Sequence, residues 1–198
     1  MSQLTLTSDP LGSATTGTLE FTTPAFYLTP ATSQRGAVLV DQYIIQTSPY
    51  TLTSQTAAQK LFNAVSNGTV TLVAGTYEFD CVFSLSSMSS SSGSFGFAFG
   101  GGATISQYWW SSANKATLAT AAGGQVTYNT AANTAIATAT TATVAFARIG
   151  GLVTVTVAGT LIPQVSLGVA AAAVVGAGSY FKIRALGDSA ATSSGNWS

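Results

Sequence analysis

Charge is the property that this sequence has least of. Only 6% of its 198 residues are charged, against roughly 25% in ordinary soluble proteins. Six Lys or Arg residues balance six Asp or Glu residues. A surface without net charge exerts no long-range attraction on nucleic acid, anionic lipid or acidic substrates. The composition therefore argues against nucleic acids and membrane surfaces as partners.

The scarcity of charge also bears on self-association. Hydrophobic residues make up 46% of the chain, and a net charge near zero gives a protein little protection against association. We expect the chain to be buried in an oligomer or in a larger particle. The alternative is an insoluble monomer.

Histidine is absent, and Cys81 is the single cysteine. The chain therefore cannot form an internal disulfide, a Ser-His-Asp or Cys-His catalytic arrangement, or a zinc site built from histidine or clustered cysteines. Residues 100–102 are three glycines, but they lack the Gly-Lys-Ser/Thr ending of a phosphate-binding loop and predict a turn. We predict that the protein is not an enzyme and binds neither a metal nor a cofactor.

Glu78 and Asp80 are the one carboxylate pair whose spacing is compatible with glycoside hydrolysis. They lie two residues apart and therefore share one face of an extended strand. Because no second strand carrying carboxylates accompanies them, we interpret them as solvated or ion-paired acids. Arg148, Lys182 and Arg184 are expected to meet Glu78, Asp80 or Asp188 at subunit contacts, since unpaired buried charges are costly.

Long apolar runs are missing too. Residues 1–10 contain no basic region followed by an apolar run, so we predict no secretory signal. The most apolar stretch, residues 161–178, is interrupted by Pro163, Gln164 and several glycines. A membrane-spanning helix needs about 20 largely apolar residues, so we predict no membrane association.

The sequence is rich in β-strand patterns, and residues 69–104 are the stretch around which the rest is organised. Residues at alternate positions are aromatic or apolar in two sets: Tyr77, Phe79, Cys81 and Phe83, and then Phe95, Phe97 and Phe99. Alternation places each set on one face of an extended strand. We predict two half-buried strands that together form the centre of an antiparallel sheet.

Only one segment favours a helix. Thr53 or Ser54 is suited to cap its first turn, and Gly68 is suited to end it. Apolar residues recur between them at helical spacing: Ala57, Leu61, Phe62 and Val65. We predict a short amphipathic helix over residues 53–67 that closes one end of a β-sandwich.

Tyr108, Trp109 and Trp110 form a dense aromatic cluster at the end of a predicted strand over residues 103–110. Adjacent side chains of a strand point in opposite directions, so one tryptophan can be buried while the other faces a partner. Packing in the core or at an interface is one interpretation of this cluster. Stacking against carbohydrate is the other.

Several short motifs recur in an order that is typical of one family. In chain order they are Tyr27-Leu28-Thr29-Pro30, Arg35-Gly36, Gln59-Lys60-Leu61-Phe62, Gly75-Thr76-Tyr77-Glu78-Phe79-Asp80, Gly159-Thr160-Leu161-Ile162-Pro163-Gln164, Gly178-Ser179-Tyr180-Phe181 and Gly195-Asn196-Trp197-Ser198. Their arrangement over residues 18–198 resembles a module of tail-fibre and other virion structural proteins of tailed bacteriophages. None of the motifs is catalytic, so the specificity of the resemblance comes from their order and spacing.

This resemblance implies a jelly-roll-like antiparallel β-sandwich that assembles as a homotrimer in the virion, after synthesis in the cytoplasm of the host bacterium. The module begins near Met1, which favours a capsid decoration or head-fibre protein over a long tail fibre. Residues 1–17 would be an extended attachment arm, and residues 18–198 the sandwich domain. The expected partners are copies of the chain and other virion proteins, such as the major capsid or tail protein.

The alternative within the same resemblance is a tail fibre or receptor-binding tip that recognises glycans of the host cell surface. Its contact residues would be Tyr108, Trp109 and Trp110.

Overall fold

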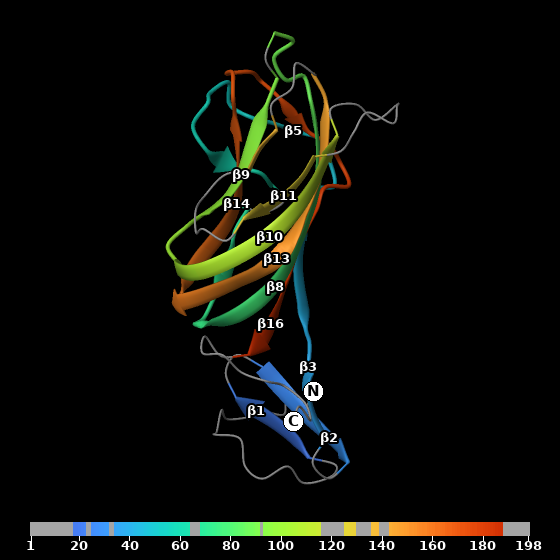
Figure 1. The fold of residues 1–198 in the computed structure, drawn as a ribbon, viewed down its shortest axis with the longest axis vertical. Coiled ribbons are helices and arrows are strands. Elements are labelled where there is room, and N and C mark those ends of the chain that lie inside the picture. Colours follow the sequence, from blue (N-terminus) through green and yellow to red (C-terminus); the bar gives the residue numbers. More distant parts are fainter. Residues whose placement is uncertain are drawn as a thin grey trace, which may run out of the picture.

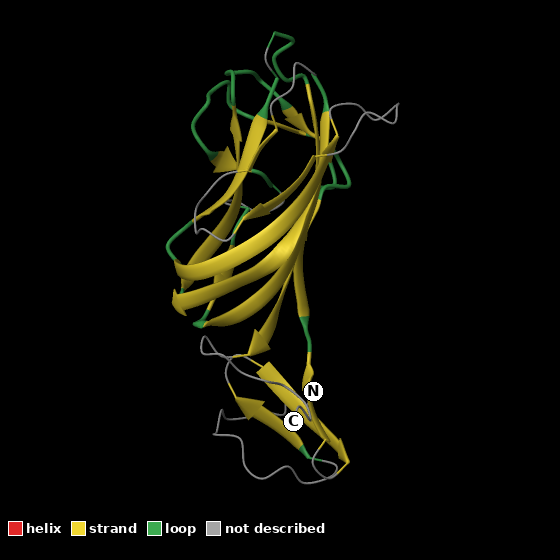
Figure 2. Cartoon of the chain, in the orientation of Figure 1, coloured by secondary structure: helices red, strands yellow, loops and turns green. Residues whose placement is uncertain are grey.

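The computed structural model describes residues 18–22, 25–31, 34–63, 68–91, 93–115, 125–129, 136–138 and 143–187. All regular structure in these ranges is β-strand, and all strand pairs are antiparallel (Figure 2). The strands are β1 (Leu19–Thr22), β2 (Ala25–Ala31), β3 (Gln34–Val38), β4 (Asp41–Ile45), β5 (Tyr50–Thr51), β6 (Gln59–Lys60), β7 (Val70–Leu72), β8 (Gly75–Ser86), β9 (Phe95–Gly100), β10 (Thr104–Lys115), β11 (Gln125–Asn129), β12 (Ile136–Thr138), β13 (Ala145–Val157), β14 (Gly159–Leu167), β15 (Val174–Val175) and β16 (Tyr180–Gly187).

Two sheets pack face to face in the body of the molecule (Figure 1). In the larger sheet the order is β11, β10, β13 and β8; β16 and β15 then pair with successive parts of β8, and β4 and β5 pair with them in turn. In the smaller sheet the order is β12, β9 and β14, and both β6 and β7 pair with β14.

This strand order is that of a jelly roll. If β4 and β5, β6 and β7, and β15 and β16 are each counted as one interrupted strand, the chain crosses repeatedly between the two sheets. Each sheet then contains four of the eight strands of the two Greek keys that define this fold. The hairpin of β10 and β11 extends the larger sheet beyond β13. The predicted all-β, jelly-roll-like sandwich is therefore confirmed.

The core lies between β8 and β9. Alternate residues of β8 are buried from Gly75 to Leu85, and the aromatic residues of β9 face them. Phe79 meets Phe99 edge to face with ring centroids 5.0 Å apart, and Phe83 meets Phe95 at 5.6 Å. The alternation in both segments was predicted correctly, but their pairing within one sheet was wrong. They belong to opposite sheets because the chain between Ser86 and Phe95 crosses from one layer to the other.

The predicted helix over residues 53–67 was also wrong. The described part of this segment, residues 53–63, contains bends and the short strand β6, while residues 64–67 lie outside the described ranges. The side-chain amide of Gln59 donates to the carbonyl of Thr53 (3.0 Å) and accepts from its backbone N–H (2.8 Å). This closed loop places Leu61 and Phe62 in the sandwich core. Helical spacing here reflects burial against the sheets rather than a helix.

Pro163 lies in β14, which is a central strand of the smaller sheet. Its carbonyl accepts a hydrogen bond from the N–H of Leu61 (2.9 Å). In an antiparallel strand the N and C=O of a residue point to the same side. The nitrogen of Pro163 therefore faces the break between β6 and β7, where the lack of an N–H costs no strand pairing.

A third, smaller sheet of β1, β2 and β3 projects from one end of the sandwich (Figure 1). It leads directly into β4 of the larger sheet. The predicted attachment arm, residues 1–17, lies outside the described residues.

The aromatic contacts between the sheets predict a large effect of truncation. Phe83→Ala should lower the free energy of unfolding by about 3–5 kcal/mol, because it leaves a cavity beside the rings of Phe95 and Phe97. Urea denaturation at one fixed protein concentration measures this. Val157→Ala is the control, because Val157 is exposed and its truncation should change stability by only about 0.5 kcal/mol. Equal losses in the two variants would contradict the assigned core.

Candidate functional site

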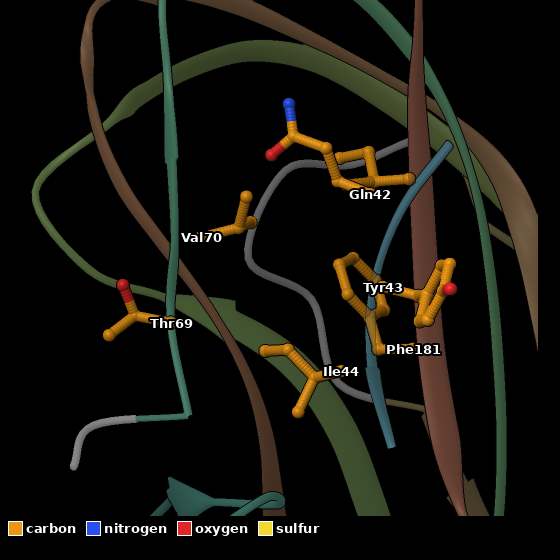
Figure 3. Close-up of a pocket in the computed structure, with 7 residues that line it drawn as sticks. Gln42, Tyr43, Ile44, Thr69, Val70 and Phe181 are labelled. Carbon is orange, nitrogen blue, oxygen red and sulfur yellow. The ribbon is translucent and has the colours of Figure 1, made fainter. Parts of the chain in front are cut away.

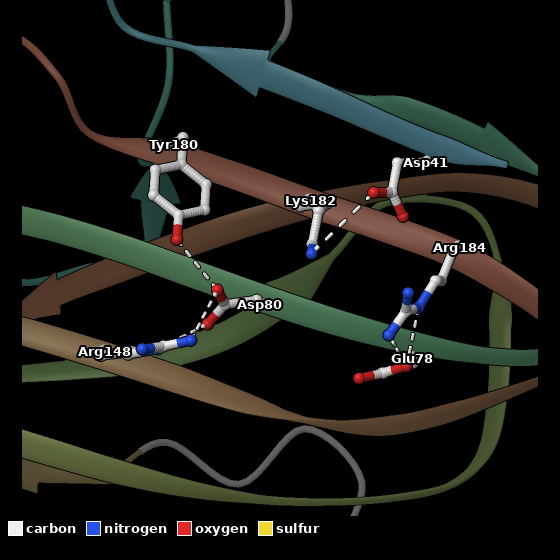
Figure 4. Close-up of polar contacts among 7 residues, drawn as sticks. All are labelled: Asp41, Glu78, Asp80, Arg148, Tyr180, Lys182 and Arg184. Atoms are coloured by element: carbon white, nitrogen blue, oxygen red, sulfur yellow. Dashed lines mark hydrogen bonds and ion pairs between the residues drawn. The ribbon is translucent and has the colours of Figure 1, made fainter. Parts of the chain in front are cut away.

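Half of the chain's twelve charged residues gather on the outer face of the larger sheet (Figure 4). They are Asp41, Glu78, Asp80, Arg148, Lys182 and Arg184, from β4, β8, β13 and β16. Strand register explains the grouping, because side chains opposite each other on neighbouring strands share a face. Each acid of this set has a basic neighbour within ion-pair distance. We call the set the charged face.

Asp80 accepts three of the hydrogen bonds on the charged face. The guanidinium of Arg148 donates from Nε to Oδ1 (3.1 Å) and from Nη2 to Oδ2 (3.3 Å), a bidentate arrangement. The hydroxyl of Tyr180 donates to Oδ2 at 2.9 Å. The hydrogen bond to Asp80 raises the pKa of Tyr180 and also that of Arg148. Both oxygens of Asp80 are therefore occupied within the chain.

The second ion pair joins Arg184 to Glu78, with Nε 2.7 Å and Nη2 2.6 Å from Oε2. Lys182 lies 3.9 Å from Asp41. These basic residues were expected to meet carboxylates at subunit contacts. The expected contacts with Glu78 and Asp80 instead form inside one chain, because β16 and β13 flank β8 on either side. Asp188 lies outside the described residues.

The charged face does not present a catalytic carboxylate pair. Glu78 and Asp80 each accept hydrogen bonds from an arginine, which favours their interpretation as ion-paired acids. Cys81, between them in sequence, points into the core and is fully buried; burial, and secondarily the charge of Asp80, raises the pKa of its thiol. A protonated, inaccessible thiol is a poor nucleophile. In the described ranges, no three His, Cys, Asp or Glu side chains cluster as metal ligands.

The aromatic cluster of Tyr108, Trp109 and Trp110 lies within β10, whose backbone pairs with β13 and β11. Its three side chains lie outside the described part of the structure. Core packing and carbohydrate stacking therefore both remain predictions for this cluster.

Exposed apolar side chains concentrate near the amino-terminal end of the described chain. Among the residues whose side-chain exposure the structure describes, eleven large apolar residues are exposed, and seven of them fall between residues 19 and 45. They are Leu19, Leu28, Val38, Leu39, Val40, Tyr43 and Ile45. We call this set the N-terminal apolar surface. The sequence gave no sign of this exposure, because an apolar stretch looks the same whether another element covers it or not.

Two pockets open beside this surface, where β4 and β7 leave the edge of the sandwich uncovered. The first, of about 220 Å³, is lined by Gln42, Tyr43, Ile44, Thr69, Val70, Phe181 and Ile183 (Figure 3). The second, of about 270 Å³, also includes Gln42, together with Phe21 of β1 and Val73. None of the described residues lining either pocket is charged. The recesses therefore suit apolar or hydroxyl-bearing groups.

Comparisons of the chain with protein families, with curated proteins and with solved structures find no match. Within the described residues, no helix has the length and apolar character needed to span a bilayer. The resemblance to phage structural proteins accordingly depends on the order of the sequence motifs.

The Tyr180–Asp80 hydrogen bond predicts a specific pH dependence. Because the pKa of Tyr180 is raised in the folded chain, its stabilising contribution is complete below about pH 10, the ordinary pKa of tyrosine. The contribution is lost as the pH rises through the folded-state pKa. The gap in urea midpoint between the wild type and Tyr180→Phe should therefore be constant near pH 8 and shrink above pH 10.

Other titrating groups do not alter the difference in urea midpoint between the wild type and Tyr180→Phe. Tyr77, whose pKa burial also raises, is present in both proteins, so its effect cancels in the difference. A gap of the same size at pH 8 and pH 11 would show that the phenol does not donate to Asp80.

Proposed function

We propose that this chain is a structural protein of a bacteriophage virion, a capsid decoration or head-fibre protein that assembles on the particle as a homotrimer. The observation that carries the proposal is the N-terminal apolar surface. Each of its seven residues exposes between 41% and 65% of its area. Exposed apolar residues gathered in one region of a soluble chain typically mark a protein interface. The function would be shape-complementary burial and would require no reactive centre.

The distribution of charge supports the same proposal. The charged face is neutralised by its own ion pairs, so it is suited to remain in water. Five residues of the N-terminal apolar surface lie away from these ion pairs, on the small sheet and on the segment that joins it to β4. The other two, Tyr43 and Ile45, lie opposite Lys182 and Tyr180 on the charged face itself. The five residues away from the ion pairs are the part of the subunit best suited to contact neighbours.

The fold gives weaker support. Jelly rolls occur in viral capsid proteins, but also in lectins and cupins, and a fold alone does not assign a function. The motif order that resembles phage virion proteins is an independent reason to prefer the viral context. The expected partners are other copies and a virion protein such as the major capsid or tail protein. Stable interfaces of this kind bury about 1,200–2,000 Å².

The proposal predicts a trimer and a defined stoichiometry on the particle. Size-exclusion chromatography with light scattering should give three times the mass of the 20.0 kDa chain. The purified protein should bind empty heads of the phage that encodes it at a ratio matching the capsid lattice. Deletion of residues 1–17 should abolish head binding if they are the attachment arm. A stable monomer that does not bind empty heads would contradict the proposal.

Glycan recognition is the alternative function, and the position of β10 is the observation in its favour. The β10–β11 hairpin lies outside the four jelly-roll strands of the larger sheet and carries Tyr108, Trp109 and Trp110. If this cluster binds host glycans, Trp109→Ala or Trp110→Ala should lower adsorption to host cells while the trimer persists. Val157→Ala is a suitable control on an exposed position. Unchanged adsorption in both tryptophan variants would exclude this role for the cluster.

A further inference from the structure

The two pockets beside β4 lie between the edges of the two sheets, and together we call them the edge groove. Among the strands that the structure describes, β4 pairs only with β16 and β7 pairs only with β14. The pockets open between these two edges and share Gln42. Buried core side chains line them, among them Phe181, Ile183 and Leu72 (Figure 3). The edge groove therefore leads from the surface to the side of the core.

The two pockets are offset from each other by two residues along the strands. The first pocket is lined by Ile44 of β4 and Val70 of β7. The second is lined by Leu72 of β7 and does not include Ile44, while Gln42 of β4 lines both. Two residues of extended chain span about 6.6 Å. A strand lying in the edge groove would therefore place side chains i and i+2 in successive pockets, since alternate side chains share a face.

Size and charge restrict the side chains that can fill these pockets. Their volumes are about 220 and 270 Å³, and an apolar cavity of about 150 Å³ is large enough for benzene. Each pocket can therefore hold one side chain of the size of leucine. None of the described residues lining them is charged, so a charged side chain would lose its hydration there without an ionic partner. The edge groove suits an extended segment with two apolar residues two positions apart.

One segment outside the described residues has this pattern. Leu4 and Leu6 flank Thr5, and residues 2–8 contain no charge. No other segment outside the described ranges has two large apolar residues two positions apart. On an extended backbone both leucines would share one face, and Thr5 and Thr7 would lie on the other. The pattern of residues 4–7 thus matches both the spacing and the chemistry of the edge groove.

The place where the N-terminal arm joins the described chain brings this segment within reach. The arm, residues 1–17, continues into β1, and Phe21 of β1 lines the second pocket. The twelve residues from Leu6 to Thr18 span up to about 40 Å. Residues 9–12, Asp-Pro-Leu-Gly, carry Asp, Pro and Gly at the positions that a type I turn favours. The arm is therefore suited to turn back toward the pocket beside β1.

We propose that residues 4–7 form an added strand along the edge of β4 in the same chain, with Leu6 in the second pocket and Leu4 in the first. From the first pocket to the second, the path along β4 runs from Ile44 to Gln42, against the direction of β4. The added strand is therefore antiparallel to β4. Segments that bind sheet edges in this way gain backbone hydrogen bonds, and pockets for alternate side chains give them specificity.

This inference goes beyond the proposed function and does not depend on it. It concerns the contact between the arm and the sandwich of one subunit, and it applies equally to a monomer and to a trimer. Its test accordingly uses the purified full-length chain without phage heads.

Disulfide formation between paired cysteines tests the added strand. The proposed register places Leu6 opposite Gln42 and Leu4 opposite Ile44. Opposed residues of antiparallel strands have Cα atoms about 4.5–5.5 Å apart, which suits a disulfide. Leu6→Cys with Gln42→Cys, and Leu4→Cys with Ile44→Cys, should therefore form disulfides within one chain under mild oxidation. Peptide mapping without reduction identifies the product.

Two control pairs accompany this test. Thr5→Cys with Gln42→Cys places one cysteine on the opposite face of the added strand. Leu6→Cys with Val157→Cys uses an exposed residue of β13 instead of β4. The natural Cys81 is fully buried and should not react. We expect at least tenfold more disulfide from the better of the two groove pairs than from either control.

Stability gives a second readout. Leu4→Ser combined with Leu6→Ser should lower the urea midpoint by about 1 M at a fixed protein concentration, because two apolar side chains no longer fill the pockets. Leu11→Ser is the matched control in the same arm, and it should leave the midpoint close to that of the wild type. Equal shifts in the two proteins would contradict a specific role for Leu4 and Leu6.

The outcomes separate this inference from the proposed function. Groove pairs that crosslink no better than the controls would overturn the added strand, whether or not the protein is a trimer. Disulfides between chains in place of disulfides within one chain would overturn the assignment to the chain's own arm. A monomer in which the groove pairs crosslink within the chain would overturn the proposed trimer and support the added strand.

Discussion

Six phenylalanine rings from the two sheets form one continuous series of contacts through the middle of the sandwich, and the positions of the other strands depend on it. In order of contact the rings are Phe95, Phe83, Phe97, Phe99, Phe79 and Phe181. Aromatic contacts of this type each contribute about 0.5–1.5 kcal/mol beyond the burial of area. Because contacts such as Phe83–Phe95 and Phe79–Phe99 join one layer to the other, the series fixes how the two sheets lie on each other. β8 is thereby held at the centre, with β13 and β16 on its two sides.

This placement of β8 also determines where the charges lie. Its inward residues belong to the aromatic core, so Glu78 and Asp80 must point outward, where β13 and β16 supply Arg148 and Arg184. Half of the chain's twelve charged residues are thus held in ion pairs on one face. The three strands of the small sheet contain two charged residues, Glu20 and Arg35. The placement of β8 therefore accounts for the charged face, and the proposed contacts with neighbours fall elsewhere, near the small sheet.

The sequence predicted structure correctly where the evidence is a local pattern of apolar residues within one strand. Period-two alternation predicted the buried faces of β8 and β9. The prediction of a helix over residues 53–67 was wrong for two reasons. Leu61 and Phe62 are buried by strands that are distant in sequence, and the side chain of Gln59 forms two hydrogen bonds with the backbone of Thr53. The partners of Arg148 and Arg184 likewise depend on register between distant strands. The exposure of Val38, Leu39 and Val40 could not be predicted, since hydrophobicity does not reveal which apolar residues another element covers.

The central claim is that the jelly roll is stable by itself, whereas the N-terminal apolar surface is covered only in the assembly. Amide hydrogen exchange at high and low protein concentration measures this directly, because dissociation uncovers the interface alone. The account predicts that amides of β1 to β3 are protected when the protein is concentrated and exchange much faster after dilution, while amides of β8 and β13 stay protected throughout. Equal exchange of β1 to β3 at both concentrations, with the trimer shown to dissociate on dilution, would contradict it.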